Sequence, residues 1–241
     1  MSHLTELRSR LLRSIACILI VFLGLSFFAN EIYTLIAAPL LQQLPKEGTM
    51  IATEVSSTFL VPFKLTFFVS IFISMPYLLY QTWAFVAPGL YENERGFALP
   101  LLLLSIILFY LGALFAFFVI FPILFRFFSL SAPVGVSFLP DISQYLKFVL
   151  HLFFAFGAAF EVPVLTILLV KTGIVSVHSL VEKRPYIIVG AFIVGMLLTP
   201  PDVMSQVLLA LPMWGLFELG LLLARHFVPD HAETLKEQEN G

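Results

Sequence analysis

The chain has 241 residues, of which 60% are hydrophobic and only 12% are Asp, Glu, Lys or Arg. Soluble domains carry roughly 25% charged residues. This composition, with a mean hydropathy of +1.01, therefore excludes an ordinary soluble fold and indicates an all-α polytopic membrane protein. The formal net charge of −2 favours no particular partner, and the single cysteine, Cys17, excludes an internal disulfide framework and any multi-cysteine metal site.

The first predicted span covers about residues 13–30 and follows a basic amphipathic segment, HLTELRSRLLRS. Leucines at i, i+3 and i+7 share one face of this segment, and Glu6 and Arg10 have the spacing of an i,i+4 ion pair. No small-x-small cleavage pattern follows the apolar stretch, so we expect an uncleaved membrane helix rather than a signal peptide.

Five further spans are predicted at about 65–87, 97–125, 146–170, 186–200 and 204–225. The segment before them, about 31–64, is expected to be partly ordered and to contain an extended TMIAT stretch. The fifth span is short because Pro200 and Pro201 end it, and the sixth begins just after Asp202. We therefore expect a tight hairpin that either crosses a thinned bilayer or has its tip below the far membrane surface.

The six spans are expected to form a single membrane domain over residues 1–227, followed by a disordered, acidic, cytoplasmic tail at 228–241. Prolines inside the spans are expected to kink several helices and to give the domain a concave face, although membrane helices also tolerate proline without such a role. These prolines are Pro76, Pro100, Pro122, Pro163 and Pro212.

Positive charges in the short loops predict the orientation. With the N-terminus inside, the inner segments hold Arg8, Arg10, Arg13, Arg95, Lys171, Lys183, Arg184, Arg225 and Lys236, and the outer ones hold Lys46, Lys64, Arg126 and Lys147. This excess favours cytoplasmic N and C termini.

Catalytic motifs are missing from the sequence: it has no HExxH, GxSxG or Walker loop, and its histidines are scattered. We therefore expect no catalytic residues, no metal and no cofactor. The informative residues are polar groups at positions where placing them costs free energy, above all inside the apolar spans. Glu161 lies ten residues before Lys171, about 15 Å from the inner end of its span, where an ionised carboxylate costs at least ~2.5 kcal/mol.

Glu161 can be interpreted either as a packing residue bonded to another helix or as a functional group facing a cavity, and the second interpretation is favoured. Glu218 in the sixth span is interpreted as structural; its side chain could either snorkel toward the inner surface or pair with a basic group. Asp202 is suited to cap the sixth helix, and Gln206 lies one turn later on the same side. The loop APGLYENERG is acidic where the charge rule favours basic residues, which hints at a cationic partner. From the residues alone, however, a solvated loop that caps a helix is the favoured interpretation.

Five ordered motifs, HLTELRSRL, LYQTWAFVAPGLYENER, FEVP, KRPY and GMLLTPPDVMSQ, closely resemble the TatC family, the core subunit of the twin-arginine protein translocase. The resemblance runs from about His3 to Phe227. It implies six helices with cytoplasmic termini and short fifth and sixth spans, in the bacterial inner membrane.

The resemblance also implies a function: recognition of twin-arginine signal peptides on folded proteins, and export with the single-span partners TatA and TatB, driven by the protonmotive force. It implies self-association in a receptor complex and no nucleic-acid binding. The implied signal-peptide site comprises Glu6, Leu7, Arg8, Phe85, Glu94 and Arg95.

The remaining motif positions imply other roles. Glu161, Asp202 and Gln206 would be membrane-embedded polar or partner contacts, and Pro39 and Pro76 would shape the chain. Glu92 departs from the family pattern and receives no role. An ion-coupled transporter using Glu161 would be expected to show repeated helix groups, and an intramembrane enzyme would need a nucleophile–base pair; neither is recognisable in the sequence.

Overall fold

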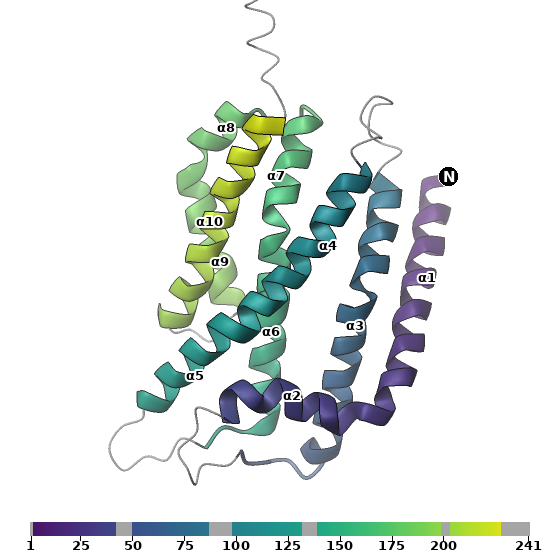
Figure 1. Ribbon diagram of the computed structural model, residues 1–241, viewed down its shortest axis with the longest axis vertical. Coiled ribbons are helices and arrows are strands. Elements are labelled where there is room, and N and C mark those ends of the chain that lie inside the picture. The colour runs from purple at the N-terminus through teal and green to yellow at the C-terminus, as the bar shows by residue number, and fades with distance from the viewer. Residues whose placement is uncertain (1, 42–49, 87–97, 132–138, 199–202, 228–241) are drawn as a thin grey trace, which may run out of the picture. The chain divides into compact units, whose positions relative to one another are not determined.

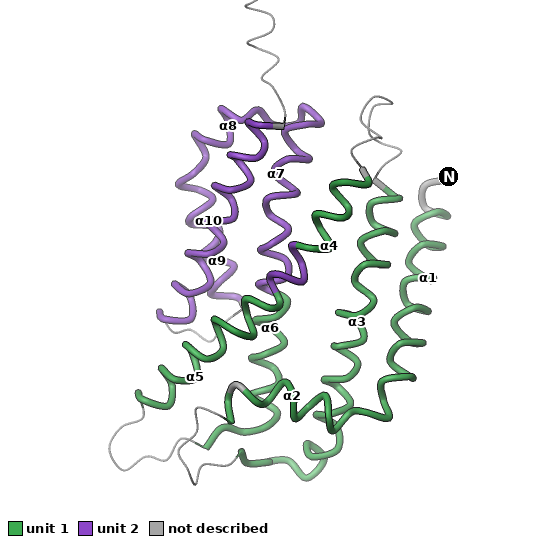
Figure 2. The backbone as a smooth tube through the Cα atoms, viewed as in Figure 1, with its two compact units in different colours: residues 1–107, 113–154 green, residues 108–112, 155–241 purple. Residues whose placement is uncertain are grey.

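The computed structural model describes five stretches of the chain: residues 2–41, 50–86, 98–131, 139–198 and 203–227. The chain forms two compact units (Figure 2): unit 1 with Met1–Ile107 and Ala113–Phe154, and unit 2 with Leu108–Gly112 and Ala155–Gly241. Within the described stretches, five helical segments are long and apolar enough to cross a membrane. The predicted class, an all-α polytopic membrane protein, is confirmed.

The helices follow one another along the chain as shown in Figure 1. The first group is α1 (Ser2–Leu25), the 3-10 helix η1 (Ser26–Phe28), α2 (Ala29–Leu41), α3 (Ser57–Val86), α4 (Ala98–Phe115), the π-helical η4 (Ala116–Ile120), α5 (Phe121–Leu130) and α6 (Ile142–Phe160). The second group is α7 (Val162–Lys171), α8 (Val177–Glu182), α9 (Arg184–Leu198) and α10 (Val203–Phe227).

A helix lies at each of the six predicted span positions. The first begins at Ser2 because the amphipathic segment continues into the span without a break, and it ends at Leu25, where η1 starts. The third predicted span continues through η4 and α5 to Leu130. Helix α9 has only 15 residues and is short, as predicted. The prediction that the sixth helix is also short is wrong, since α10 has 25 residues and continues through Pro212. The number of crossings, the side on which the termini lie, the concave shape and the single-domain organisation stay predictions.

Aromatic side chains pack α3, α5 and α6 together in unit 1. Phe121 and Phe153 meet edge to face with ring centroids 5.0 Å apart, and Phe72 meets Phe153 at 5.5 Å. Phe68 contacts Phe154 in the same way at 4.5 Å. Because lipid tails are as apolar as these side chains, close packing rather than water exclusion has to hold membrane helices together, and such aromatic pairs contribute about 0.5–1.5 kcal/mol each.

Helix α2 turns away from α1 at η1 and runs across the end of unit 1 where α3 and α6 begin (Figure 1). The hydroxyl of Tyr145 in α6 donates a hydrogen bond of 2.8 Å to the carbonyl oxygen of Ile36 in α2. Ile36 also packs against a buried cluster that contains Val61 and Leu65 of α3. The prediction that the segment after the first span is partly ordered is confirmed by this helix.

Residues 50–53, the described part of the predicted extended stretch TMIAT, pair with the chain just before α6. The N–H of Ile51 donates to the carbonyl oxygen of Pro140 at 3.1 Å, and the N–H of Ile142 donates to the carbonyl oxygen of Ile51 at 2.9 Å. These two bonds form an isolated parallel bridge between Ile51 and Asp141. The bridge therefore connects the segment before α3 to the start of α6.

Asp141 caps α6 and holds the same two segments together. Its Oδ1 accepts hydrogen bonds from the N–H groups of Ser143 and Gln144 at 2.9 and 3.0 Å. Its Oδ2 accepts from the hydroxyl and the N–H of Thr53 at 2.7 and 3.0 Å. The Thr53 hydroxyl, followed by the backbone donors, lowers the pKa of Asp141 to about 2. The ionised carboxylate is thus part of the fold.

In unit 2, α10 packs closely on α7. A Cβ atom added at Gly220 of α10 would lie 2.8 Å from the Cα of Pro163 and 3.0 Å from the Cβ of Thr166 in α7. Only glycine leaves room for the two backbones at this distance. At Gly215, one and a half turns earlier in α10, an added Cβ would meet nothing within 4 Å.

The five prolines in the predicted spans affect their helices differently. The helix is interrupted before Pro163, between α6 and α7, and before Pro122, where π-helical η4 precedes α5. Pro100 lies in the first turn of α4, where its missing donor costs little. Helices α3 and α10 continue through Pro76 and Pro212, in agreement with the tolerance of membrane helices for proline.

Candidate functional site

The first turns of α1 carry three of the residues predicted to bind a signal peptide. Leu7 and Arg8 are exposed, and the side chain of Glu6 is 37% exposed. The predicted pair between Glu6 and Arg10 is confirmed: Nη2 and Nε of Arg10 donate to Oε1 of Glu6 at 2.7 and 3.0 Å. The carboxylate is therefore held at the surface by a residue of its own helix.

Arg10 also connects α1 to α3. Its Nη1 donates to Oε1 of Gln81 at 3.0 Å, and Nε2 of Gln81 donates to the hydroxyl oxygen of Tyr77 at 2.7 Å. Gln81 is buried, with 6% of its surface exposed. Gln81 and Tyr77 were missed in the sequence; the available signal was an uncharged polar side chain inside an apolar span, four residues before Phe85.

This contact brings together two predicted site segments that are far apart in the chain. Glu6 and Arg10 are one turn apart on α1, and Gln81 and partly buried Phe85 are one turn apart on α3. The beginning of α1 and the end of α3 consequently lie at the same end of unit 1 (Figure 1). A carboxylate, exposed apolar side chains and an aromatic ring are thus available at one end of the unit.

Three of the predicted residues lie outside the part of the chain that the structure describes, and two others are prolines within helices. Glu94 and Arg95 of the predicted signal-peptide site, and Asp202 of the hairpin, lie outside the described residues. Pro39 belongs to α2, and Pro76 lies in the interior of α3. The roles assigned to these five residues stay predictions.

Glu161 stands at the interruption between α6 and α7. Its N–H donates to the carbonyl oxygen of Ala158, three residues earlier, at 3.1 Å, whereas a regular α-helix would use the carbonyl four residues earlier. Helix α7 then begins with Val162. The residue is partly buried, and Pro163, two positions later, is the residue against which Gly220 packs. The predicted coincidence of a carboxyl group and a helix break is confirmed, and α10 packs within one turn of it.

Two polar contacts connect α9 and α10 in unit 2. Nε2 of Gln206 donates to the carbonyl oxygen of Phe192 at 2.9 Å, so this predicted site residue joins the two helices of the hairpin. Nearer the other end of α9, Nη2 of Arg184 lies 2.7 Å from Oε2 of Glu218. Of the two alternatives considered for Glu218, the pairing with a basic group is the one observed, and the partner is Arg184 of the KRPY motif.

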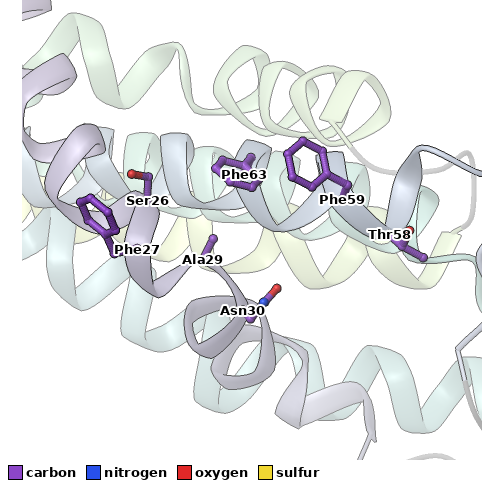
Figure 3. A pocket seen from close by; sticks show the side chains of 7 residues that line it. All are labelled: Ser26, Phe27, Ala29, Asn30, Thr58, Phe59 and Phe63. Atoms are coloured by element: carbon purple, nitrogen blue, oxygen red, sulfur yellow. The ribbon is translucent and has the colours of Figure 1, made fainter.

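A pocket in unit 1 is lined by none of the predicted site residues that the structure describes. It has a volume of about 310 Å³ and lies between the η1 turn and the first turns of α3 (Figure 3). Its lining consists of Ser26, Phe27, Ala29, Asn30, Thr58, Phe59 and Phe63. Phe59 and Phe63 stand one turn apart on α3, with ring centroids 4.8 Å apart. It contains no charged side chain and is not the site indicated by the sequence motifs.

Apolar helices with polar contacts at their ends define a multi-pass helical membrane protein. A family model described as Sec-independent protein translocase protein (TatC) matches residues 2–212. The chain belongs to this TatC family. It is therefore a component of a protein translocase in the bacterial inner membrane, which is a transport protein and not an enzyme.

Relatives and solved structures agree with this assignment. A TatC protein of Azotobacter chroococcum is 60% identical over 91% of this chain and 86% of its own length. A TatC protein of Escherichia coli K12 is 56% identical over 94% of this chain and 88% of its own. Two crystal structures described as the twin arginine translocase receptor TatC cover 92% of this chain and 98% and 99% of their own, with TM-scores of 0.81 and 0.83 and identities of 38% and 37%.

Proposed function

We propose that this chain is the receptor and organising subunit of a twin-arginine translocase, and that it binds signal peptides where α1 begins and α3 ends. The observation that carries the proposal is the hydrogen bond between Arg10 and Gln81, which brings Glu6 and Phe85 to the same end of unit 1. The solved relatives described as twin arginine translocase receptors support it.

The chemistry of this end suits a peptide with adjacent arginines and an apolar stretch. A carboxylate such as Glu6 can accept parallel hydrogen bonds from a guanidinium, a geometry that a lysine ammonium does not reproduce. In this proposal Glu94 supplies the main counter-charge for the arginine pair, and Arg8 and Arg95 contribute to the same site. Leu7 and Phe85 offer apolar surface for the neighbouring side chains of the peptide.

The translocase function also requires partners. In this proposal the single-span proteins TatA and TatB contact the chain near Glu161 and near the hairpin residues Asp202 and Gln206. The inserted signal peptide lies in the same region. Copies of the chain associate in the receptor complex, and the protonmotive force drives export. The exposed apolar face of α9, which includes Tyr186, Val189 and Ile193, offers a surface for another membrane helix.

Site-specific crosslinking in membranes tests the recognition site. A photoreactive residue at Phe85 is expected to capture an Arg-Arg signal peptide and to capture the matched Lys-Lys peptide at least tenfold less. A photoreactive residue at Phe27, which is 86% exposed in η1, is the control and should show no preference for the Arg-Arg peptide. Equal capture of the two peptides at Phe85 would overturn the proposed receptor function.

Reconstitution tests the partners. Transport of a folded reporter with an Arg-Arg signal is expected only when TatA and TatB are both present, and a protonophore should stop it. Transport by this chain alone would contradict the proposed division of labour.

A further inference from the structure

The carboxylate of Glu6 already has a guanidinium bound to it. Both described donors, Nη2 and Nε of Arg10, converge on Oε1 at 2.7 and 3.0 Å. Arg10 therefore presents to Glu6 the same functional group that the proposed signal peptide would bring. The Arg10 side chain is only 22% exposed, so it is lodged between α1 and α3 and does not extend into solvent.

Arg10 has a second acceptor that does not depend on Glu6. Its remaining donor group, Nη1, is bonded to Oε1 of Gln81 at 3.0 Å. Gln81 is buried, and its amide orientation is fixed because Nε2 donates to the hydroxyl oxygen of Tyr77 at 2.7 Å. If Arg10 released Glu6, its charge would keep a hydrogen bond to a fixed neutral acceptor.

We propose that Arg10 is a resident occupant of the recognition carboxylate, and that a signal-peptide arginine displaces it toward Gln81. This inference rests on the proposed function of Glu6 in signal-peptide binding. Arg10 is then a specificity-determining residue, because every incoming cation has to replace the two hydrogen bonds that Arg10 gives to Glu6.

The geometry explains why this exchange would favour arginine over lysine. A partly exposed i,i+4 ion pair is held weakly, so a ligand can displace it. A guanidinium replaces two N–H donors with two of its own, whereas an ammonium is a point charge without the planar fork. Without Arg10, the carboxylate would be open to either cation, and the preference for arginine would decrease.

Arg13 provides a matched control for the experiment. It lies on the same helix, carries the same charge and is exposed, and it is not part of the described contacts among Glu6, Arg10, Gln81 and Tyr77. Arg10→Gln and Arg13→Gln each remove one positive charge near the site. Any general gain in affinity for cations therefore occurs in both variants, and only the effect of the displaced guanidinium is specific to Arg10.

The measurement is the dissociation constant of Arg-Arg and Lys-Lys signal peptides for the full chain in membranes. For Arg10→Gln we expect Lys-Lys binding to become about tenfold tighter, Arg-Arg binding to change less, and the Arg-Arg preference to decrease accordingly. Arg13→Gln should keep the preference of the unmodified chain. An unchanged preference in Arg10→Gln overturns the inference, and so does a loss of Arg-Arg binding, which would mean that Arg10 only positions Glu6.

Gln81→Leu tests the second acceptor separately. It should weaken Arg-Arg binding when Arg10 is present, because displaced Arg10 then loses its acceptor, and it should have little effect in the Arg10→Gln background. An equal effect in both backgrounds overturns the role given to Gln81. If the unmodified chain binds both peptides equally, the proposed receptor function fails instead, so the two failures are distinguishable.

Discussion

Glu161 is a carboxyl group at a helix break inside an apolar segment, and its chemistry can be tested by isosteric replacement. If the side chain acts through hydrogen bonding, Glu161→Gln should retain most transport activity, because the amide keeps the shape and can donate and accept. Glu161→Leu and Glu161→Ala should lower transport about tenfold, a loss that corresponds to one or two hydrogen bonds. Transport of an Arg-Arg reporter into membrane vesicles measures this.

Glu182 is a suitable control for that series. It is an exposed carboxylate in α8, paired only with His178 at 3.2 Å among the described residues, so Glu182→Gln should leave transport unchanged. Equal activity of Glu161→Gln, Glu161→Leu and Glu161→Ala would show that the carboxyl group has no part in hydrogen bonding.

Asp141 predicts a particular dependence of stability on pH. Its pKa is lowered from 3.8 to about 2 in the folded chain, so the unfolded chain binds the proton more readily. The stability that this carboxylate contributes is complete above about pH 4 and is lost as the pH falls toward 2. The melting temperature of the detergent-solubilised protein should decrease in this range.

Asp141→Asn should lower the melting temperature at neutral pH, because the amide cannot accept the Thr53 donors and cap α6 as the carboxylate does. The melting temperature of this variant should also decrease less between pH 4 and pH 2 than that of the unmodified chain. An identical acid profile in Asp141→Asn and in the unmodified chain would show that other carboxylates determine the pH dependence.

At the scale of helices, α7 and α10 provide a test of packing with an internal control. Gly220→Ala should destabilise the protein by about 1–3 kcal/mol, since the added Cβ would lie 2.8 Å from the backbone of Pro163 and α10 would have to move. Gly215→Ala, on the same helix, meets no atom within 4 Å and should be neutral or stabilising by up to about 1 kcal/mol. Thermal unfolding of the two purified variants would give both differences, and similar values for the two would contradict the close approach of α7 and α10.

The apolar runs predicted where helices form, but not where they turn. Residues 26–41 are also largely apolar, and only tertiary contacts such as that between Tyr145 and Ile36 show that α2 leaves the direction of α1. The break at Glu161 was predictable because Pro163 removes a backbone donor locally. A proline by itself does not show that a helix breaks, however, since α3 continues through Pro76.

The candidate site was predictable only as far as single helices allow. The pair of Glu6 and Arg10 follows from i,i+4 spacing, but the partner of Arg10 on α3 lies 71 positions away along the sequence. No periodicity within α1 identifies such a residue. Likewise, the sequence allowed Glu218 either to snorkel or to pair with a basic group, and identifying Arg184 rather than Arg225 as its partner required the packing of α9 on α10.

At the scale of the whole molecule, the position of the C-terminus distinguishes five crossings from six. Helices α9 and α10 run antiparallel, joined by Arg184 with Glu218 near one end and by Phe192 with Gln206 further along. A 15-residue helix is about 22 Å long against a hydrocarbon core of about 30 Å, so α9 spans most of the depth that α10 spans beside it. We therefore expect both helices to cross, which returns the C-terminus to the side of the N-terminus.

Cysteine labelling in intact cells decides the number of crossings, and the chain is convenient for it because Cys17 is its single cysteine. In a Cys17→Ala background, Val55→Cys, at a fully exposed position before α3, should react with an impermeant thiol reagent from outside. His178→Cys in α8 and Gln238→Cys in the C-terminal tail should react only after permeabilisation. If His178→Cys is protected while Gln238→Cys reacts from outside, α9 does not cross and the chain has five spans. In that arrangement α9 and α10 would not form a hairpin across the membrane, so this one measurement tests both the topology and the predicted hairpin.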